Sequence, residues 1–274
     1  MKEVIRCEPP APWLGGKSRL ADRIVDLIEG IDHDLYLEPF TGMGGVFFRR
    51  RRSVKCEVIN DFNGEVANLF RQLRRHHNVV LEEARFLLGS REEFERFKAQ
   101  RPDLMTEIER AVRFLYLQHQ AFGGKPSGQN FGVDRERGSR FSIEKIEINI
   151  ERIRKRLSSV IIENLDFIEV IDRYDGGRAL VYLDPPYYGG EGDYGKSLFS
   201  RSRFVDLAAR LSRLAGTFIL SINDVPAIRE IFSDFAMLEV QTKYTIQGGE
   251  AKNVGELLIS NSEGALVGAQ KTLI

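Results

Sequence analysis

Short apolar runs alternate along the chain with longer segments in which apolar residues recur every three or four positions. The short runs, rich in Val, Ile and Leu, are typical of buried strands, and the longer segments are typical of helices that cover a sheet. The pattern predicts strands at 34–38, 56–60, 160–163, 179–183, 217–222, 237–243 and 255–260, with helices such as those at 17–28, 64–75, 204–214 and 226–232 between them. This alternation predicts an α/β fold with a Rossmann-like, mostly parallel, seven-stranded sheet.

One stretch, from about Arg75 to Arg156, breaks the alternation because it contains no convincing strand. Helices are predicted there at 92–98 and 105–120, and a loop rich in Gly, Ser and Arg follows at 122–140. We therefore expect a sheet domain made of residues 1–75 and 157–274, and a helical subdomain inserted at 76–156. Basic residues gather in the second half of the insertion: Arg135, Arg137, Arg140, Lys145, Arg152, Arg154, Lys155 and Arg156. Such a run is either a solvated helical face or a phosphate-binding surface.

The composition excludes several classes of protein. Forty basic residues balance forty acidic ones, so the net charge of zero gives no sign of a polyanionic partner. Cys7 and Cys56 are too few for a disulfide framework or a thiolate zinc site, and the four histidines have no partner at metal-ligand spacing. No apolar run has the length of a signal peptide or approaches the roughly 18 residues of a membrane span. We therefore expect a cytoplasmic protein with neither a metal nor a membrane partner.

The strongest chemical signal is Asp184-Pro185-Pro186-Tyr187, directly after the apolar run 179–183. In an open α/β sheet, ligands bind beyond the carboxyl ends of the strands, where this turn would lie. Two prolines stiffen the turn and remove backbone donors, so the turn presents carbonyl oxygens. The Asp184 carboxylate and a neighbouring carbonyl form a pair of acceptors that suits a neutral amino group. Tyr187 offers a flat face on which a planar base can stack.

Two other strand ends also carry acids. The run Glu38-Pro39-Phe40-Thr41-Gly42-Met43-Gly44-Gly45 joins one acid to a glycine turn, and glycines let the backbone approach a ligand closely. The dinucleotide pattern G-x-G-x-x-G fails, because Phe47 stands where the third glycine should be. The next strand ends at Asn60-Asp61-Phe62, and an acid there is placed to accept hydrogen bonds from both hydroxyls of a ribose. Together the two strand ends favour a nucleoside ligand.

The segment Trp13-Leu14-Gly15-Gly16-Lys17-Ser18 ends like a phosphate loop. The Walker pattern needs a glycine where Ala11 stands and a strand before it, and the proline-rich residues 8–12 cannot form a central strand. A nucleoside triphosphatase is therefore disfavoured. A lysine at a helix start still suits a carboxylate or a phosphate.

In their order along the chain, these motifs resemble those of the Dam-type DNA adenine methyltransferases, which use S-adenosylmethionine to methylate the exocyclic amino group of adenine. The matching features are Trp13-x-Gly15-Gly16-Lys17, Glu38-Pro39-Phe40-x-Gly42-x-Gly44, Asn60-Asp61, Asp166-Phe167 and Asp184-Pro185-Pro186-Tyr187. The resemblance implies a site-specific enzyme, in some relatives part of a restriction-modification system, with double-stranded DNA as its partner. It also implies a target-recognition role for the insertion, a monomer or weak dimer, and DNA contacts from Asn130, Arg135, Arg137 and Arg140.

Carried over residue by residue, the resemblance implies a cofactor site. Its members would be Trp13, Lys17, Glu38, Phe40, Gly42, Gly44, Asp61, Phe62, Asp166 and Asp184. Trp13 and Lys17 would hold the methionine end of S-adenosylmethionine, and Asp61 would bind the ribose. Phe62 would pack on the adenine ring of the cofactor, and Asp166 would accept a hydrogen bond from its amino group. Alternatively, Phe40 and Phe62 are core residues and Asp166 is the N-cap of a helix.

The chemistry would then lie at Asp184, Pro185, Pro186 and Tyr187. A target adenine must leave the duplex to reach them, at a cost of a few kcal/mol, and stacking on Tyr187 returns roughly 1–3 kcal/mol. Two acceptors on the amino hydrogens leave the nitrogen free to displace the methyl group directly, without a covalent enzyme intermediate. The glycine-rich segment 188–195 is expected to close over the flipped base.

Two other hypotheses stay open. One is an amino-methyltransferase for RNA, cytosine or protein glutamine; glutamine enzymes usually begin the motif with Asn, and cytosine amino-methyltransferases more often with Ser, whereas this chain has Asp184. A cytosine carbon-5 enzyme would need a cysteine nucleophile, and neither Cys7 nor Cys56 lies in a Pro-Cys motif. The other is an inactive nucleic-acid-binding relative, which the intact motif disfavours.

Overall fold

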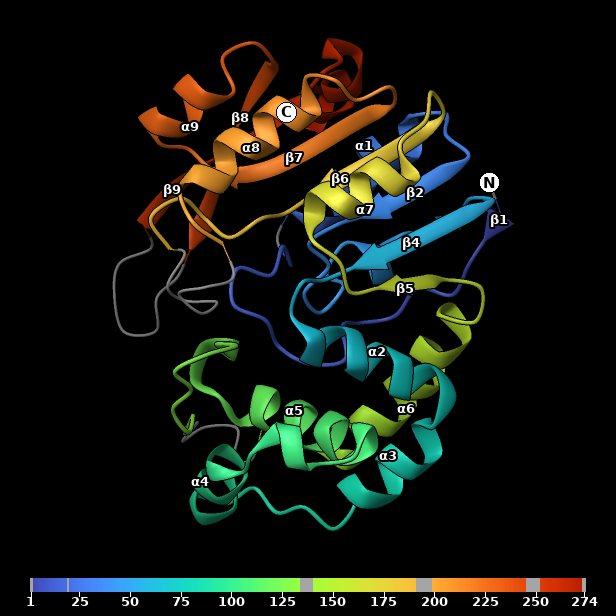
Figure 1. Ribbon diagram of the computed structural model, residues 1–274, viewed down its shortest axis with the longest axis vertical. Helices are drawn as coiled ribbons and strands as arrows, with labels where there is room; N and C mark the ends of the chain where they lie inside the picture. Colours follow the sequence, from blue (N-terminus) through green and yellow to red (C-terminus); the bar gives the residue numbers. More distant parts are fainter. Residues whose placement is uncertain (1, 19, 134–139, 191–198, 245–251, 273–274) are drawn as a thin grey trace.

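The computed structural model describes residues 2–18, 20–133, 140–190, 199–244 and 252–272. A sheet with helices on both faces forms one half of the molecule, and a group of helices forms the other (Figure 1). The segment that precedes the first helix runs between the two halves (Figure 1).

The sheet has seven strands in the order β5-β4-β2-β6-β7-β9-β8. In chain order they are β2 (Leu35–Glu38), β4 (Cys56–Asn60), β5 (Ile161–Glu163), β6 (Ala179–Leu183), β7 (Thr217–Asn223), β8 (Ala236–Tyr244) and β9 (Lys252–Ser260). Strands β5, β4, β2, β6 and β7 are parallel, whereas β9 lies antiparallel between β7 and β8. The prediction of a Rossmann-like, mostly parallel sheet is confirmed. The strand order reverses between β2 and β6, and ligands bind at the carboxyl ends of strands at such a switch point.

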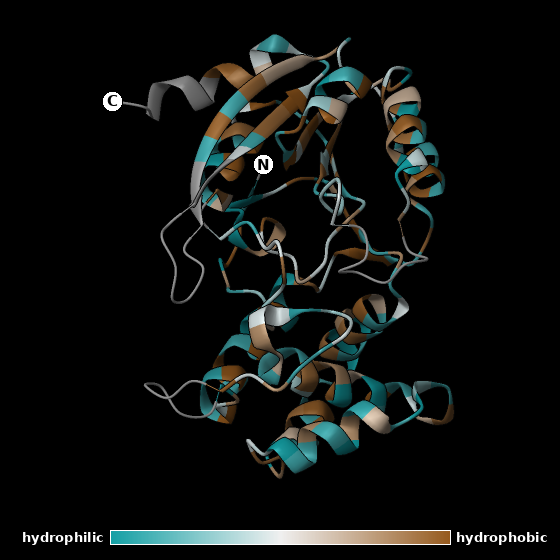
Figure 2. Ribbon diagram, turned by 90° about the vertical axis from the view of Figure 1, so that its left-hand side faces the viewer, coloured by the Kyte–Doolittle hydropathy of each residue, from teal (hydrophilic) through white to brown (hydrophobic). Residues whose placement is uncertain are grey.

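Each face of the sheet has its own hydrophobic cluster, because successive residues of a strand point to opposite faces. Tyr36 and Leu180 belong to one cluster, together with α1 (Ala21–Gly30). Leu37 and Val181 belong to the other, together with α7 (Phe167–Tyr174), α8 (Ser202–Leu211) and α9 (Pro226–Ile231). Apolar residues accordingly concentrate in the sheet and along one side of several helices (Figure 2).

Element boundaries follow the prediction closely at the centre of the sheet, where β4, β6 and α2 (Gly64–Arg75) agree with it to the residue. The helix predicted from Lys17 begins only at Ala21, because tight turns precede it: Ser18 donates to the carbonyl of Gly16, and Leu20 donates to that of Lys17. A short antiparallel pair, β1 (Lys2–Glu3) with β3 (Arg52–Ser53), was not predicted, since two residues leave no pattern. Short 3-10 helices are η1 (Phe47–Arg49), η2 (Pro102–Leu104), η3 (Phe122–Gly124) and η5 (Glu263–Thr272).

The group of helices contains α3 (His77–Ala84), α4 (Arg91–Ala99), α5 (Glu107–Gln120) and α6 (Ile143–Arg156), which lie on the side of α2 away from the sheet (Figure 1). Side-chain caps fix where several helices start. Asn63 caps α2, Ser90 caps α4, and Thr106 forms a capping box with Glu109 at the start of α5. That residues 76–156 act as a separate target-recognition subdomain stays a prediction.

A buried group of charges, the Arg50–Glu57–Arg156 triad, joins the end of α6 to the sheet. Arg156 donates to both carboxylate oxygens of Glu57, at 2.6 and 2.9 Å, and Arg50 donates to one of them. The two guanidinium groups stack on aromatic rings, Arg50 at 3.8 Å from the Tyr36 centroid and Arg156 at 4.0 Å from that of Phe47.

The triad corrects one reading of the basic run in the insertion. Arg156 is buried, and Arg154 and Lys155 pair with Glu151 of the same helix. The end of α6 is therefore not a phosphate-binding surface as a whole. The burial of Arg156 could not be predicted, because the local sequence does not reveal the acid on β4 with which it pairs.

Candidate active site

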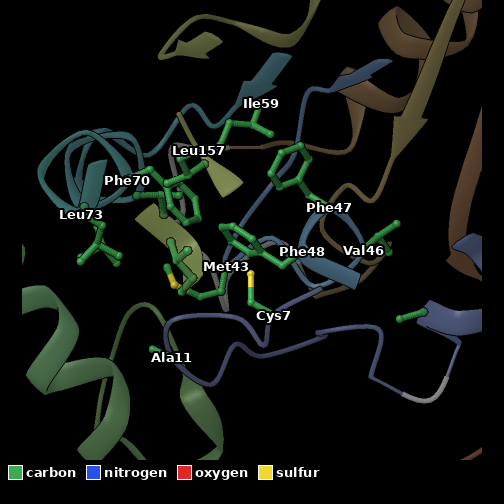
Figure 3. Close-up of a cluster of buried hydrophobic side chains, with 14 of the residues drawn as sticks. Cys7, Ala11, Met43, Val46, Phe47, Phe48, Ile59, Phe70, Leu73 and Leu157 are labelled. Atoms are coloured by element: carbon green, nitrogen blue, oxygen red, sulfur yellow. The ribbon is translucent and has the colours of Figure 1, made fainter. Parts of the chain in front are cut away.

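A hydrophobic cluster supports the turn that follows β2. Cys7 and Ala11 of the N-terminal segment meet Met43, Val46 and Phe47 of this turn there, and residues of α2 complete the cluster (Figure 3). Burial raises the pKa of the Cys7 thiol to about 12, so this cysteine stays protonated at neutral pH.

A cavity of about 480 Å³ opens at the carboxyl ends of β2 and β6, where the strand order reverses. Residues 8–18, the turn after β2, the end of β4 and the turn after β6 contribute to its lining. Of the predicted site residues, its lining includes Trp13, Lys17, Glu38, Phe40, Gly42, Asp61, Phe62, Asp184 and Pro186. The structure thus brings together residues from four motifs that lie far apart in the sequence.

Glu38 is the last residue of β2 and is buried at the base of this cavity. The hydroxyl of Tyr36 donates to its Oε2 at 2.8 Å. Burial raises the pKa of Glu38 to about 8, although the Tyr36 hydrogen bond acts in the opposite direction. At neutral pH the side chain is therefore mostly protonated, and a cation in the cavity would favour its ionised form.

Asp61, just after β4, stabilises the glycine turn that follows β2. Its carboxylate accepts hydrogen bonds from the backbone N–H of Gly42 at 2.8 Å and of Asn63 at 2.9 Å. Burial raises its pKa to about 6, and these two hydrogen bonds lower it. Gly42 has a φ of 51°, and a Cβ there would lie 2.6 Å from the indole nitrogen of Trp13. The turn therefore requires glycine, both for its backbone conformation and for the close approach of Trp13.

Lys17 has partners that the sequence did not predict. Its ammonium lies 2.6 Å from Oδ1 of Asp184 and 3.2 Å from Oε1 of Glu256, with both the lysine and Glu256 almost fully buried. It also donates to the Tyr187 hydroxyl at 3.3 Å and lies 4.6 Å from the centroid of that ring. In this structure Lys17 thus binds the protein's own acids, where a carboxylate of the ligand was expected.

Asp184 is the acid of this group that borders the cavity, and Lys17 also contributes to the lining. Its side chain is 20% exposed, and the Ser221 hydroxyl lies 3.4 Å from Oδ1. Burial raises the pKa of Asp184 to about 6, whereas Lys17 lowers it. Both polar contacts fall on Oδ1, which leaves Oδ2 as the oxygen that a ligand donor can reach.

The turn that carries Asp184 is held by the neighbouring strand. Asn223, the last residue of β7, accepts from the backbone N–H of Tyr188 at 2.9 Å and donates to its carbonyl at 3.1 Å. This amide therefore fixes the chain directly after the Asp-Pro-Pro-Tyr motif. Asn223 and Asp224 follow an apolar run in the sequence, a position that alone is only a weak signal for a functional site.

Asp166 and Phe40 have structural partners of their own. Asp166 caps α7 by accepting from Ile168 N at 2.9 Å, and it pairs with Arg203. From the sequence, Asp166 was either a cofactor contact or the N-cap of a helix, and the structure shows the N-cap. Phe40 lines the cavity and also packs on Phe167 and Phe199, with centroids 5.4 and 5.7 Å apart.

Helix α5 and the loop after it hold the N-terminal part of the site. Gln118 donates to the carbonyl of Pro12 at 3.0 Å, Leu14 N donates to the Gly124 carbonyl at 2.9 Å, and His119 Nε2 lies 2.9 Å from the Pro10 carbonyl. His119 lines the cavity, and burial lowers its pKa. No pattern in the sequence indicates these contacts, because they join residues more than a hundred positions apart.

The predicted DNA-contact residues are only partly described. Asn130 is exposed, and its carbonyl accepts from Phe122 N at 2.8 Å. Arg140 is half-buried, with its guanidinium 5.9 Å from the centroid of the exposed Phe122 ring. Arg135 and Arg137 lie outside the described residues, as does most of the segment 188–195 that was expected to close over a base.

Within the described ranges, no helix is long and apolar enough to cross a membrane. Nor does this part of the chain contain a group of three His, Cys, Asp or Glu side chains that could hold a metal ion.

A Rossmann-like sheet whose switch point presents two strand-end acids and an Asp-Pro-Pro-Tyr turn is the arrangement of an amino-methyltransferase. The chain belongs to the D12 class of N6 adenine-specific DNA methyltransferases, whose family model matches residues 13–246. It is therefore an adenine-specific DNA methyltransferase, as the motifs predicted.

Three curated relatives match nearly the whole chain. The type II methyltransferase M1.LlaDCHI of Lactococcus lactis subsp. cremoris is 30% identical, over 95% of this chain and 97% of its own length. The type II methyltransferase M.CviBI of Paramecium bursaria Chlorella virus NC1A is 24% identical, over 93% of this chain and 99% of its own. A DNA adenine methylase of Haemophilus influenzae is 24% identical, over 93% of both chains.

Proposed function

We propose that this enzyme transfers a methyl group from S-adenosylmethionine to the exocyclic amino group of an adenine that has left double-stranded DNA, by direct displacement and at a specific sequence. One observation carries the proposal. Asp184 borders the cavity at the switch point, and its contacts with Lys17 and Ser221 both fall on the same oxygen, Oδ1.

The residues around the cavity fit this cofactor. A volume of about 480 Å³ is within the usual range for small-molecule sites. The acids Glu38 and Asp61 suit a ligand with a cationic sulfonium, an ammonium and a ribose, and the glycine turn at Gly42 lets the backbone approach it. Trp13, Phe40 and Phe62 would supply apolar contacts. When bound, S-adenosylmethionine supplies an electrophilic methyl group on a positively charged sulfur.

The target base would enter beside Asp184. Oδ2 of Asp184 and the carbonyl of Pro185 would accept the two hydrogens of the amino group, so that the nitrogen lone pair is directed at the methyl group. Lys17 lies 4.6 Å from the centroid of the Tyr187 ring, and the base would stack on this aromatic side chain. Holding two reactants in this way can supply roughly 7–11 kcal/mol of the barrier. No side-chain nucleophile is needed.

The transfer forms a nitrogen–carbon bond and breaks the carbon–sulfur bond, and the nitrogen then releases one proton. Asp184 is placed to accept it, because its carboxylate would already be hydrogen-bonded to that amino group. Its pKa of about 6 lets it pass the proton to water at neutral pH.

The DNA would lie across the open side of the cavity and against the helices of residues 76–156. We assign contacts with it to Asn130 and Arg140, and to Arg135 and Arg137. Type II methyltransferases among the relatives suggest a defined short target, and the target itself is to be read from experiment.

The decisive experiment is to incubate the protein with labelled S-adenosylmethionine and unmethylated DNA, and to map methyladenine by sequencing. We expect label in DNA, at adenines within one recurring sequence. Label on RNA or protein but not on DNA, or no label at all with folded protein, would contradict the proposal.

A further inference from the structure

Glu256 is a buried acid in the middle of an apolar strand. It lies on β9 directly before Leu257, Leu258 and Ile259, and all four side chains are almost fully buried. Burying an ion costs several kcal/mol unless the ion is well paired. Among the described residues, the charged partner of Glu256 is Lys17, at 3.2 Å, and neither carboxylate oxygen accepts a hydrogen bond of normal geometry. An apolar residue at this position would avoid the cost of burying a carboxylate, so a reason for the acid is sought in its contact with Lys17.

Lys17 stands between two acids at unequal distances. Its ammonium is 2.6 Å from Oδ1 of Asp184 and 3.2 Å from Glu256. A lysine paired with Asp184 alone would hold the carboxylate in place but would also partly neutralise its negative charge. A second acid on the same ammonium reduces this effect, because Lys17 then divides its charge between two partners.

We propose that Glu256 is a positioning residue for methyl transfer: from β9 it holds the Lys17 ammonium, so that Lys17 fixes one oxygen of Asp184 without neutralising Asp184 as an acceptor. The proposal rests on the proposed function, because it assigns Asp184 as the acceptor for the adenine amino group. Glu256 touches neither substrate nor cofactor and acts through Lys17.

Several polar groups influence Asp184 electrostatically: Lys17 before α1, Glu256 on β9, Ser221 on β7, Tyr182 on β6 and Glu38 on β2. Tyr187, in the same turn as Asp184, acts on Lys17. Lys17 lowers the pKa of Asp184, and Glu256 raises it. Removing each charge in turn should therefore move the titration of Asp184 in opposite directions, a result that a merely structural role for Glu256 would not give.

The test compares Glu256→Gln and Lys17→Met with the wild-type protein, with Glu239→Gln as the matched control. Glu239 lies on the neighbouring strand β8, is exposed and pairs with Arg229, so the same substitution there leaves the site unchanged. The first measurement needs no activity: carbon-13 NMR titration of the aspartate carboxyls, with Asp184→Asn to assign the signal. We expect the Asp184 pKa to fall in Glu256→Gln, to rise in Lys17→Met and to stay unchanged in Glu239→Gln.

The second measurement is the pH profile of kcat on DNA. Glu256→Gln should lower kcat about tenfold, as expected for weakening one acceptor interaction in the transition state. Its acidic limb should shift to lower pH, and KM for DNA should change less than about twofold. If Glu256→Gln does not fold, Glu256→Asp replaces it, because the shorter side chain places the carboxylate farther from Lys17. We expect smaller shifts of the Asp184 pKa and of the acidic limb, in the same directions.

The outcomes separate the two proposals. An Asp184 titration that does not move in the Glu256 variants overturns the positioning role, whatever the activity. Wild-type protein that methylates DNA, together with an unchanged kcat profile in Glu256→Gln, also overturns it while the proposed function stands. Wild-type protein that methylates no DNA contradicts the proposed function, and the NMR titration then still decides whether Glu256 tunes Asp184.

Discussion

Two groups of buried charges in this enzyme differ in their ratio of cations to acids. The Arg50–Glu57–Arg156 triad has two cations and one acid, and both oxygens of Glu57 accept hydrogen bonds from guanidinium groups. The group around Lys17 has one cation and two acids, and one of these acids, Asp184, borders the cavity. The first group is closed and links α6 to the sheet. The second leaves Asp184 at the cavity, and under the proposed function this difference separates a structural charge cluster from a reactive one.

The largest effect is expected at the open acceptor. Asp184→Ala should lower methyl transfer by about a thousandfold or more, in the range seen when a group that contacts the reacting atoms is removed. The free energy of unfolding should fall by less than the roughly 3–5 kcal/mol expected for breaking a buried pair, because Glu256 remains as a partner of the buried Lys17 ammonium. Single-turnover transfer of labelled methyl groups measures the first quantity, and urea unfolding measures the second. Activity within tenfold of the wild type would refute the role of Asp184.

A substitution in the Arg50–Glu57–Arg156 triad should lower the stability of the protein and should not act on methyl transfer directly. Glu57→Gln leaves two buried guanidinium groups without their acid, and breaking a buried pair in this way costs about 3–5 kcal/mol. The matched control is Glu151→Gln, because Glu151 pairs with Arg154 and Lys155 on the surface, where such pairs contribute about 0–1 kcal/mol. Urea unfolding of both variants gives the comparison. Equal losses in the two variants would show that the triad is no more important than a surface pair.

The pH dependence of stability should reveal the raised pKa of Glu38, another acid that lines the cavity. Its pKa is about 8 in the folded protein and near 4.5 in an unfolded chain. Between these values the folded state holds a proton that the unfolded state has released, so the contribution of Glu38 to stability falls as pH rises from 4.5 to 8. Relative to Glu38→Gln, the wild type should therefore lose stability over this range and then level off. Unfolding curves between pH 5 and 9 measure it, and parallel curves for the two proteins would contradict the raised pKa.

The smallest effect is expected at Asp166, which tests whether this acid belongs to the cavity or to α7. Loss of an N-cap costs about 1 kcal/mol, so Asp166→Ala should destabilise by that amount, whereas Asp166→Asn should keep the cap. If capping is its role, the Kd for S-adenosylmethionine should change less than about threefold in both variants. Calorimetric titration measures this, and a large loss of affinity in Asp166→Asn would instead support the contact with the cofactor.

The central sheet and the acids at its switch point could be predicted from the sequence. Apolar runs fixed β4 and β6 to the residue, and the carboxyl ends of parallel strands converge, so Glu38, Asp61 and Asp184 were expected near one another. The asparagine that holds the Asp-Pro-Pro-Tyr turn gave only a weak signal, because its partners are backbone atoms of another segment.

The partners of the buried charges could not be predicted. Glu256 reaches Lys17 only because β9 inserts antiparallel between β7 and β8, and local periodicity contains no information on strand order. Arg156 was read as a solvent-facing base for the same reason, since its acid lies on β4. An acid directly before the apolar run 257–259 was the one available signal, and that acid is Glu256.

The position of β9 has a consequence for biosynthesis. Domains fold largely as units as the chain emerges from the ribosome, early segments first. A nascent chain that has exposed everything up to β8 already contains the Asp-Pro-Pro-Tyr turn and Lys17, but it lacks the strand that brings the second acid to that lysine. The ion pair between Lys17 and Glu256 can form only when β9 joins the sheet beside β7. Synthesis of this late strand is therefore the step that completes the buried charge group around Lys17.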